Sequence, residues 1–174
     1  DLSEASLVAA AEAAAEAAGI GDGGARVIAL DGHGPHRHRV GEVRVDPRSV
    51  PKDLRVDLLR AADDAARSYD PQVVQVSAGV ADSRRSILVA NTDGLHAADE
   101  VTRVLFRVNV VADADGGKQT GYQSMGRTTG WEAFDEYDVA AMASDAARQA
   151  VVKLGARPAP TGAMPVVIAR GTGG

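Results

Sequence analysis

Residues 85–131 constrain the fold of this chain more than any other stretch. Two runs of strand-forming residues, 86–91 and 101–112, are each followed by residues typical of tight turns, Asn-Thr-Asp-Gly after the first and Asp-Ala-Asp-Gly-Gly after the second. A polar segment punctuated by glycines comes next. Because strong turn chemistry between such runs favours hairpins, this stretch predicts an antiparallel sheet.

The predicted sheet has four sequential strands in a meander. Residues 72–80 and 86–91 are expected to form a hairpin through a turn at 81–84. Residues 101–112 alternate between a more polar and a more apolar face, as expected for a strand covered on one side. A glycine turn then leads to a fourth strand at 118–125.

Three helices are predicted around this sheet. Residues 2–18 are rich in alanine, and residues 52–69 place leucine and alanine at helical spacing. The third helix covers residues 137–154, with Asp138 as its N-cap and Gly155 as its C-terminal stop. Further short strands are predicted at 27–30, 42–45 and 164–169.

These elements predict an α+β fold, an antiparallel β-meander packed with about three α-helices, in a single domain of residues 1–174. A net charge of -5 with no cluster of lysine or arginine argues against a nucleic-acid partner. The absence of cysteine fits a cytoplasmic protein and excludes thiolate chemistry in this chain. No apolar run approaches the ~20 residues of a membrane span, so we expect no membrane partner.

Histidines and carboxylates are the candidate catalytic or metal-binding groups. His33, His36 and His38 share an irregular loop that offers no rigid second shell, which favours a solvated loop over a functional metal site and leaves adventitious metal binding open. His96 follows a turn, where a surface role is favoured. The remaining candidates are two acidic groups, typical of solvated turns and helix starts: Asp93, Asp99 and Glu100, and Glu132, Asp135 and Glu136.

The glycine-punctuated segment after the fourth strand has features that suit binding. Its glycines allow close backbone approach, and its polar residues could hold an extended peptide through main-chain hydrogen bonds. The alternative is a frayed hairpin followed by a connector. The residues predicted to face a substrate or partner are Gly121, Tyr122, Gly126, Arg127, Gly130 and Trp131.

The order and spacing of several motifs resemble the TldD/PmbA family, bacterial and archaeal proteins also described as modulators of DNA gyrase. The resemblance covers residues 52–174 and rests on a strand ending in a Thr-Asp-Gly turn, a long strand, a glycine-rich segment, a helix ending near Leu-x-Ala, and a Pro-x-Gly-x-x-Pro-Val-Val strand. Here these are residues 91–94, 101–112, 121–130, 154–156 and 160–167.

This resemblance implies a TldD-like zinc metallopeptidase acting on unfolded peptides. Active members of the family carry a His-Glu-x-x-x-His helix, which does not occur in this sequence. The resemblance therefore implies that residues 1–174 are most of an amino-terminal, non-catalytic domain that restricts substrate access, with the catalytic domain beginning after residue 174. No catalytic residue, metal ligand or cofactor is expected in this chain, and zinc is implied for the intact protein.

The partners implied by the resemblance are the carboxy-terminal catalytic domain of the same chain, an unfolded peptide substrate, and either a second copy or a TldE-like subunit in a dimer. The Asn-Thr-Asp-Gly turn and the Met-Pro-Val-Val strand favour the catalytic TldD type. The alternative is a non-catalytic partner subunit of the PmbA/TldE type, or an interaction scaffold.

Overall fold

The computed structural model describes residues 3–17, 42–91 and 93–168. The chain divides into two compact units, Asp1–Arg37 with Ser86–Asp99 and His38–Arg85 with Glu100–Gly174, and each is described by itself. The elements, in chain order, are α1 (Glu4–Ala17), a 3-10 helix η1 (Pro47–Ser49), α2 (Lys52–Arg67), β1 (Val73–Ala90), β2 (His96–Ala114), β3 (Gly117–Arg127), α3 (Ala133–Glu136) and α4 (Val139–Leu154).

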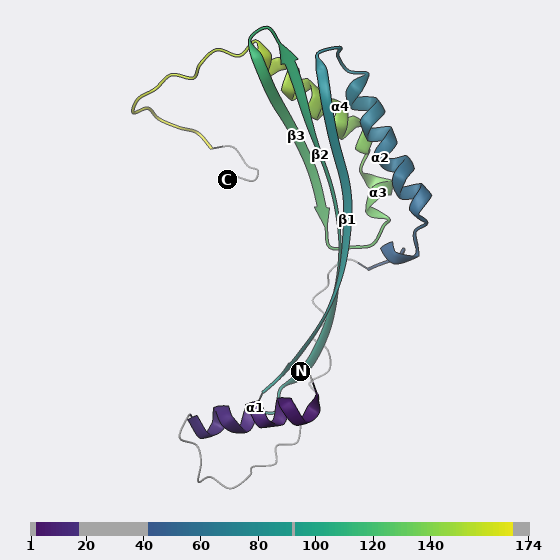
Figure 1. Cartoon of the computed structure of the whole chain (residues 1–174), viewed down its shortest axis with the longest axis vertical. Coiled ribbons are helices and arrows are strands. Elements are labelled where there is room, and N and C mark those ends of the chain that lie inside the picture. Colours follow the sequence, from purple (N-terminus) through teal and green to yellow (C-terminus); the bar gives the residue numbers. More distant parts are fainter. Residues whose placement is uncertain (1–2, 18–41, 92, 169–174) are drawn as a thin grey trace. The chain divides into compact units, whose positions relative to one another are not determined.

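The described strands form one sheet in the order β1-β2-β3 (Figure 1). β2 and β3 are antiparallel, and their pairing runs from Ala114 opposite Gly117 to Val104 opposite Arg127. Successive strands are therefore neighbours, as the turn chemistry predicts. The α+β fold class, an antiparallel sheet packed with helices, is confirmed.

One face of the sheet is buried in the larger unit and the other is open. Along β2, Phe106, Val108 and Val110 are 0 % exposed. Arg103, which precedes them, and Arg107, which lies between Phe106 and Val108, are exposed. This confirms the two-faced alternation predicted for the strand. Helices α2 and α4 cover the buried face (Figure 1), and α4 contributes mostly small side chains to the core: Ala143, Ala146, Ala147 and Ala150.

The turn predicted at 81–84 is wrong, because β1 continues through it from Val73 to Ala90. This segment contains no glycine, and no described non-glycine residue has a positive φ. Asp82 is instead held in the strand by an ion pair with Arg55 of α2, 2.5 Å between Oδ1 and Nη1. A partner on a packed helix thus stabilises a polar residue inside a long strand, and in the described part of the chain the meander has three strands where four were predicted.

The predicted short strands are also corrected where the structure describes them. Residues 42–45 have no strand partner, and residues 164–168 are irregular. The amides of Arg44 and Val45 donate to the Glu132 carboxylate, so a side chain takes the place of a neighbouring strand. The strand predicted at 27–30 lies outside the described residues.

Helix positions agree well with the sequence. α2 begins at Lys52 as predicted and ends at Arg67, and α4 begins directly after its N-cap. The Asp138 carboxylate accepts hydrogen bonds from the amides of Ala140 and Ala141, at 2.9 and 3.0 Å, which confirms it as the cap. Among the described residues no helix is long and apolar enough to cross a membrane.

In the smaller unit, α1 buries none of its residues. The turn after β1 is the one that the sequence predicts. Asn91 accepts hydrogen bonds at Oδ1 from the amides of Asp93 and Leu95, both at 3.0 Å. Gly94 has a φ of 91°, a conformation that favours glycine.

Candidate functional site

The predicted binding residues divide into two groups in the structure. Three of them lie in packed surroundings. A Cβ atom on Gly121 would lie 1.8 Å from the carbonyl oxygen of Ala146 in α4, and one on Gly130 would lie 2.2 Å from the carbonyl oxygen of Val45. The backbone amide of Trp131 donates to the same Val45 oxygen at 2.9 Å. Glycine at these positions is therefore explained by close packing within the domain.

The other three lie at the surface. Tyr122 is 52 % exposed and Gly126 is exposed, both on the open face of the sheet. Arg127 ends β3, and its guanidinium lies 4.6 Å from the ring centroid of Tyr137. Contact of these residues with a substrate or partner stays a prediction.

β3 presents a free edge along this surface. It is the last strand of the sheet order, and no backbone group of the described residues other than those of β2 pairs with it. In an antiparallel pair, residues alternate between bonding the partner strand and pointing their main-chain groups away from it. Counting from the Ala114–Gly117 pair that closes the hairpin, the groups that point away are those of Thr120, Tyr122 and Ser124. Such an edge can accept an extended chain.

One contact on this edge agrees with that alternation. The ammonium of Lys153 in α4 donates to the carbonyl oxygen of Thr120 at 2.8 Å. A lysine at a sheet edge is a common protection against unwanted strand pairing. Tyr122 and Ser124, further along the strand, have no such side-chain donor among the described residues.

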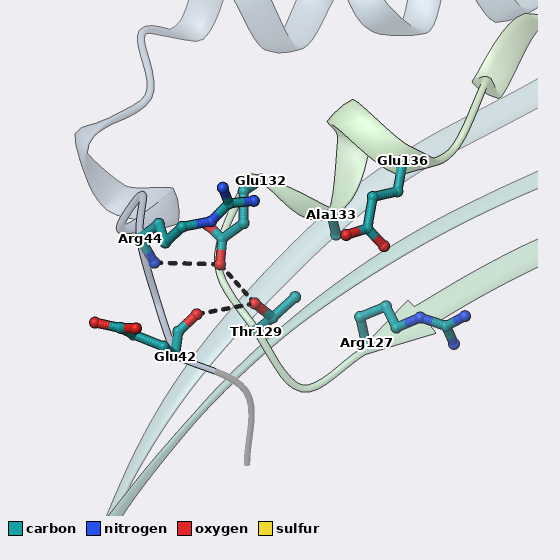
Figure 2. Close-up of a pocket in the computed structure, with 7 residues that line it drawn as sticks. All are labelled: Glu42, Arg44, Arg127, Thr129, Glu132, Ala133 and Glu136. Carbon is teal, nitrogen blue, oxygen red and sulfur yellow. Dashed lines mark hydrogen bonds between the residues drawn. The ribbon is translucent and has the colours of Figure 1, made fainter. Parts of the chain in front are cut away.

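A pocket of about 320 Å³ lies beyond the end of β3 (Figure 2). The carboxylate of Glu132 is its central polar group, since it accepts hydrogen bonds from the amides of Arg44, Val45 and Gly130 at 3.2, 2.9 and 3.0 Å. The hydroxyl of Thr129 donates to it as well, at 2.5 Å. The pocket is lined by Glu42, Arg44, Arg127, Thr129, Glu132, Ala133 and Glu136.

These contacts decide the ionisation of Glu132. Burial raises its pKa, but the hydrogen bonds from Thr129 and from the amides of Val45 and Arg44 outweigh burial, so the pKa falls from 4.5 to about 2. A carboxylate with so low a pKa is a poor proton acceptor at neutral pH. Glu132 therefore joins the segment before α2 to the connection after β3 and is poorly suited to act as a base.

Arg55 supports the same connection from the other side. Its guanidinium pairs with Asp82, donates to the carbonyl oxygen of Pro47, and lies 5.0 Å from the ring centroid of Trp131. Trp131 in turn packs against Phe134, with 4.5 Å between the ring centroids. The end of β3 is thus fixed by contacts from η1, α2 and β1.

Metal-ligand clusters are the one kind of catalytic centre that the resemblance implies for the intact protein. No three His, Cys, Asp or Glu side chains among residues 3–17, 42–91 and 93–168 are close enough to hold a metal ion. The loop of His33, His36 and His38 lies outside these residues. His96 is exposed at the start of β2. The described residues therefore do not fit a zinc centre of the kind that the resemblance implies for the intact protein.

Sequence reasoning placed Glu132 among solvated acidic residues, whereas it is 5 % exposed. Its partners Arg44 and Val45 are far away in the sequence, so no local pattern identifies the contact. Its other partners, Thr129 and Gly130, precede it by three and two residues, and only they lie within reach of a short sequence pattern.

Known proteins resemble this chain in sequence. Residues 45–154 match the family model described as the PmbA/TldA metallopeptidase central domain. The chain is 35% identical over 128 residues to a metalloprotease TldD homolog of Haemophilus influenzae and 32% identical over 124 residues to one of Buchnera aphidicola. These alignments cover 71% and 67% of this chain but only 27% and 26% of the relatives, so the chain spans about a quarter of their length.

Two solved structures share the fold. A Thermotoga maritima protein, proposed to be a modulator of a DNA gyrase, superposes with a TM-score of 0.58 at 19% identity, covering 67% of this chain and 26% of that one. A Bacteroides thetaiotaomicron protein with a similar description gives a TM-score of 0.57 at 13% identity, covering 79% of this chain and 28% of that one.

Proposed function

The chain belongs to the PmbA/TldD family of metallopeptidases, and from this premise we propose that it is the non-catalytic, substrate-restricting domain of a TldD-like zinc metallopeptidase acting on unfolded peptides. The TldD type is supported by the names of the relatives, both metalloprotease TldD homologs. The bond-breaking chemistry would belong to another part of a longer protein, because this sequence has no His-Glu-x-x-x-His motif.

The observation that carries a peptide-contacting role is the free edge of β3. Main-chain groups of Tyr122 and Ser124 point outwards there, and an extended substrate could add to the sheet through them. Main-chain hydrogen bonds bind an extended backbone with little dependence on its sequence, and in a folded protein most backbone groups are already paired. An edge of this kind would therefore bind unfolded chains in preference to folded proteins.

The surroundings of the edge suit this role. Gly126 has no side chain and lies on the same open face as Tyr122, four residues further along β3, so a second backbone can approach closely there. Thr129 and Glu132 fix the chain directly after β3, which keeps the edge in place without a bound peptide. The proposed partners are the catalytic domain of the same polypeptide, a second copy or a TldE-like subunit, and the peptide, in the cytoplasm.

The experiment compares the 174-residue chain with the longer gene product that contains it. We expect the longer protein to contain zinc and to hydrolyse an unfolded peptide, and to lose both properties on chelation. The chain alone should contain no zinc and cleave no peptide. Zinc content by atomic absorption and cleavage by mass spectrometry are the measurements.

Hydrolysis by the 174-residue chain alone would contradict the proposal. A longer protein that binds no zinc and cleaves nothing would also contradict it, and would identify the chain as part of a non-catalytic PmbA/TldE-type subunit. Both proteins are to be purified without a histidine tag, since the tag itself binds zinc.

A further inference from the structure

Two arginines of β2 on the open face of the sheet have no acidic partner among the described residues. Arg103 and Arg107 are exposed on β2, and no carboxylate in the described part of the chain forms an ion pair with either. Most other described arginines lie against a carboxylate, and the pairs are Arg48–Asp46, Arg55–Asp82, Arg60–Asp57, Arg67–Asp63, Arg84–Glu100 and Arg148–Asp145. Arg103 and Arg107 thus place two positive groups on one face of a strand in a chain of net charge -5.

The surface around Arg107 is shallow because its neighbours are small. Its Nε lies 3.6 Å from where a Cβ on Gly79 of β1 would be, so the side chain extends flat across that glycine. On its other side, Arg107 is opposite Ser124 of β3. The next outward residue, Leu105, lies in the same way beside Gly126, 3.8 Å from where its Cβ would be. Because Gly79 and Ser124 are small, the guanidinium of Arg107 is accessible to a ligand on the open face.

The distance between the two arginines indicates how far apart the acidic groups of a ligand should be. Positions four residues apart on one strand face the same way and lie roughly 13 Å apart. In an extended peptide, acidic side chains at positions i and i+4 also share one face at the same separation. Each guanidinium can hold a carboxylate through two parallel hydrogen bonds.

We propose that the open face of the sheet at Arg103 and Arg107 is a docking site for an extended, acidic polypeptide segment with carboxylates four residues apart. The positive charges of Arg103 and Arg107 favour an acidic partner. Nucleic acids and anionic membranes need many cations to offset the repulsion of an acidic protein, and β2 offers two on this face. The site is distinct from the β3 edge of the proposed function, because it uses side chains of β2 on the sheet face and no main-chain pairing.

The test measures binding of two fluorescein-labelled peptides to the 174-residue chain by fluorescence polarisation at low salt. One peptide has glutamates four positions apart in a background of threonine and valine, and the other has glutamine at those positions. We expect the glutamate peptide to bind about tenfold more tightly than the glutamine peptide, and this difference to vanish at high salt.

Two double variants test whether the arginines cause the difference in affinity between the glutamate and glutamine peptides. Arg103→Gln with Arg107→Gln should abolish the preference for glutamate, whereas Arg60→Gln with Arg67→Gln, which removes the same charge from exposed positions of α2, should leave it intact. Arg103→Glu with Arg107→Glu should instead prefer a peptide with lysine at the two positions, a gain that also shows that the variant is folded.

Three results would overturn the proposal. The first is equal binding of the glutamate and glutamine peptides by the unmodified chain. The second is an equal loss in both double variants, which would show only general electrostatics. The third is tighter binding of single-stranded DNA or of phosphatidylserine vesicles than of the glutamate peptide. Because the glutamine peptide measures binding that needs no arginine, failure here leaves the β3 edge to be judged separately.

Discussion

Gly121→Ala is expected to lower the free energy of unfolding by about 3 to 5 kcal/mol. The added methyl carbon would lie 1.8 Å from the carbonyl oxygen of Ala146 and 2.8 Å from the amide nitrogen of Ala150, both in the backbone of α4. No side-chain rotation relieves such a contact. The helix has to move away from β3. Its buried alanines then lose contact with the sheet, because a methyl side chain is too short to span the gap.

The measurement is urea-induced unfolding followed by circular dichroism, with Gly126→Ala as the matched control in the same strand. There the nearest atom to the new methyl group is Leu105 Cδ1 at 3.8 Å, an ordinary contact, so we expect little change. Equal unfolding midpoints for the two variants would show that α4 does not pack on β3 as described.

Glu132→Gln is expected to cost about 2 to 4 kcal/mol at neutral pH. The carboxylate accepts hydrogen bonds from Arg44, Val45, Thr129 and Gly130, and a glutamine amide group would turn a donor towards some of these donors. The loss should separate the segment before α2 from the end of β3. Glu136→Gln on the same pocket is the control, since Glu136 is exposed.

The same variant should change the response to acid. Because the pKa of Glu132 is about 2 in the folded state and 4.5 without the fold, the unfolded state takes up the proton first as pH falls. The stabilisation by this group is complete above pH 4.5 and is lost as the pH falls towards 2. Glu132→Gln should lack this part of the acid sensitivity, whereas Asp46 and Asp145, whose pKa values are also lowered, keep theirs. Identical acid profiles for variant and unmodified chain would contradict the assignment.

The sequence predicted those parts of the fold that depend on local pattern. The alternation along β2 identified its buried face, because one face of the strand is more polar than the other. Asp138 identified the start of α4, since a cap acts within its own helical turn. The turn predicted at 81–84 was wrong because the ion pair between Asp82 and Arg55 joins residues that are distant in the sequence.

The candidate site shows the same division. Glycines marked the segment from Gly121 to Gly130 as unusual, but a glycine can serve a packed helix as well as a bound ligand. Only the partner atoms in α4 and at Val45 show that Gly121 and Gly130 serve packing. The Glu132 contact with Arg44 and Val45 joins two irregular segments, for which periodicity gives no signal.

The measurement that tests the central claim most directly is amide hydrogen exchange in β3 with and without an unfolded peptide, read by nuclear magnetic resonance. If an extended peptide adds to the free edge, the outward amides of Tyr122 and Ser124 should exchange about tenfold more slowly when the glutamine peptide is bound. The amides of Gln123 and Met125, which already face β2, should not change. Binding of the peptide with no added protection at Tyr122 and Ser124 would contradict the account.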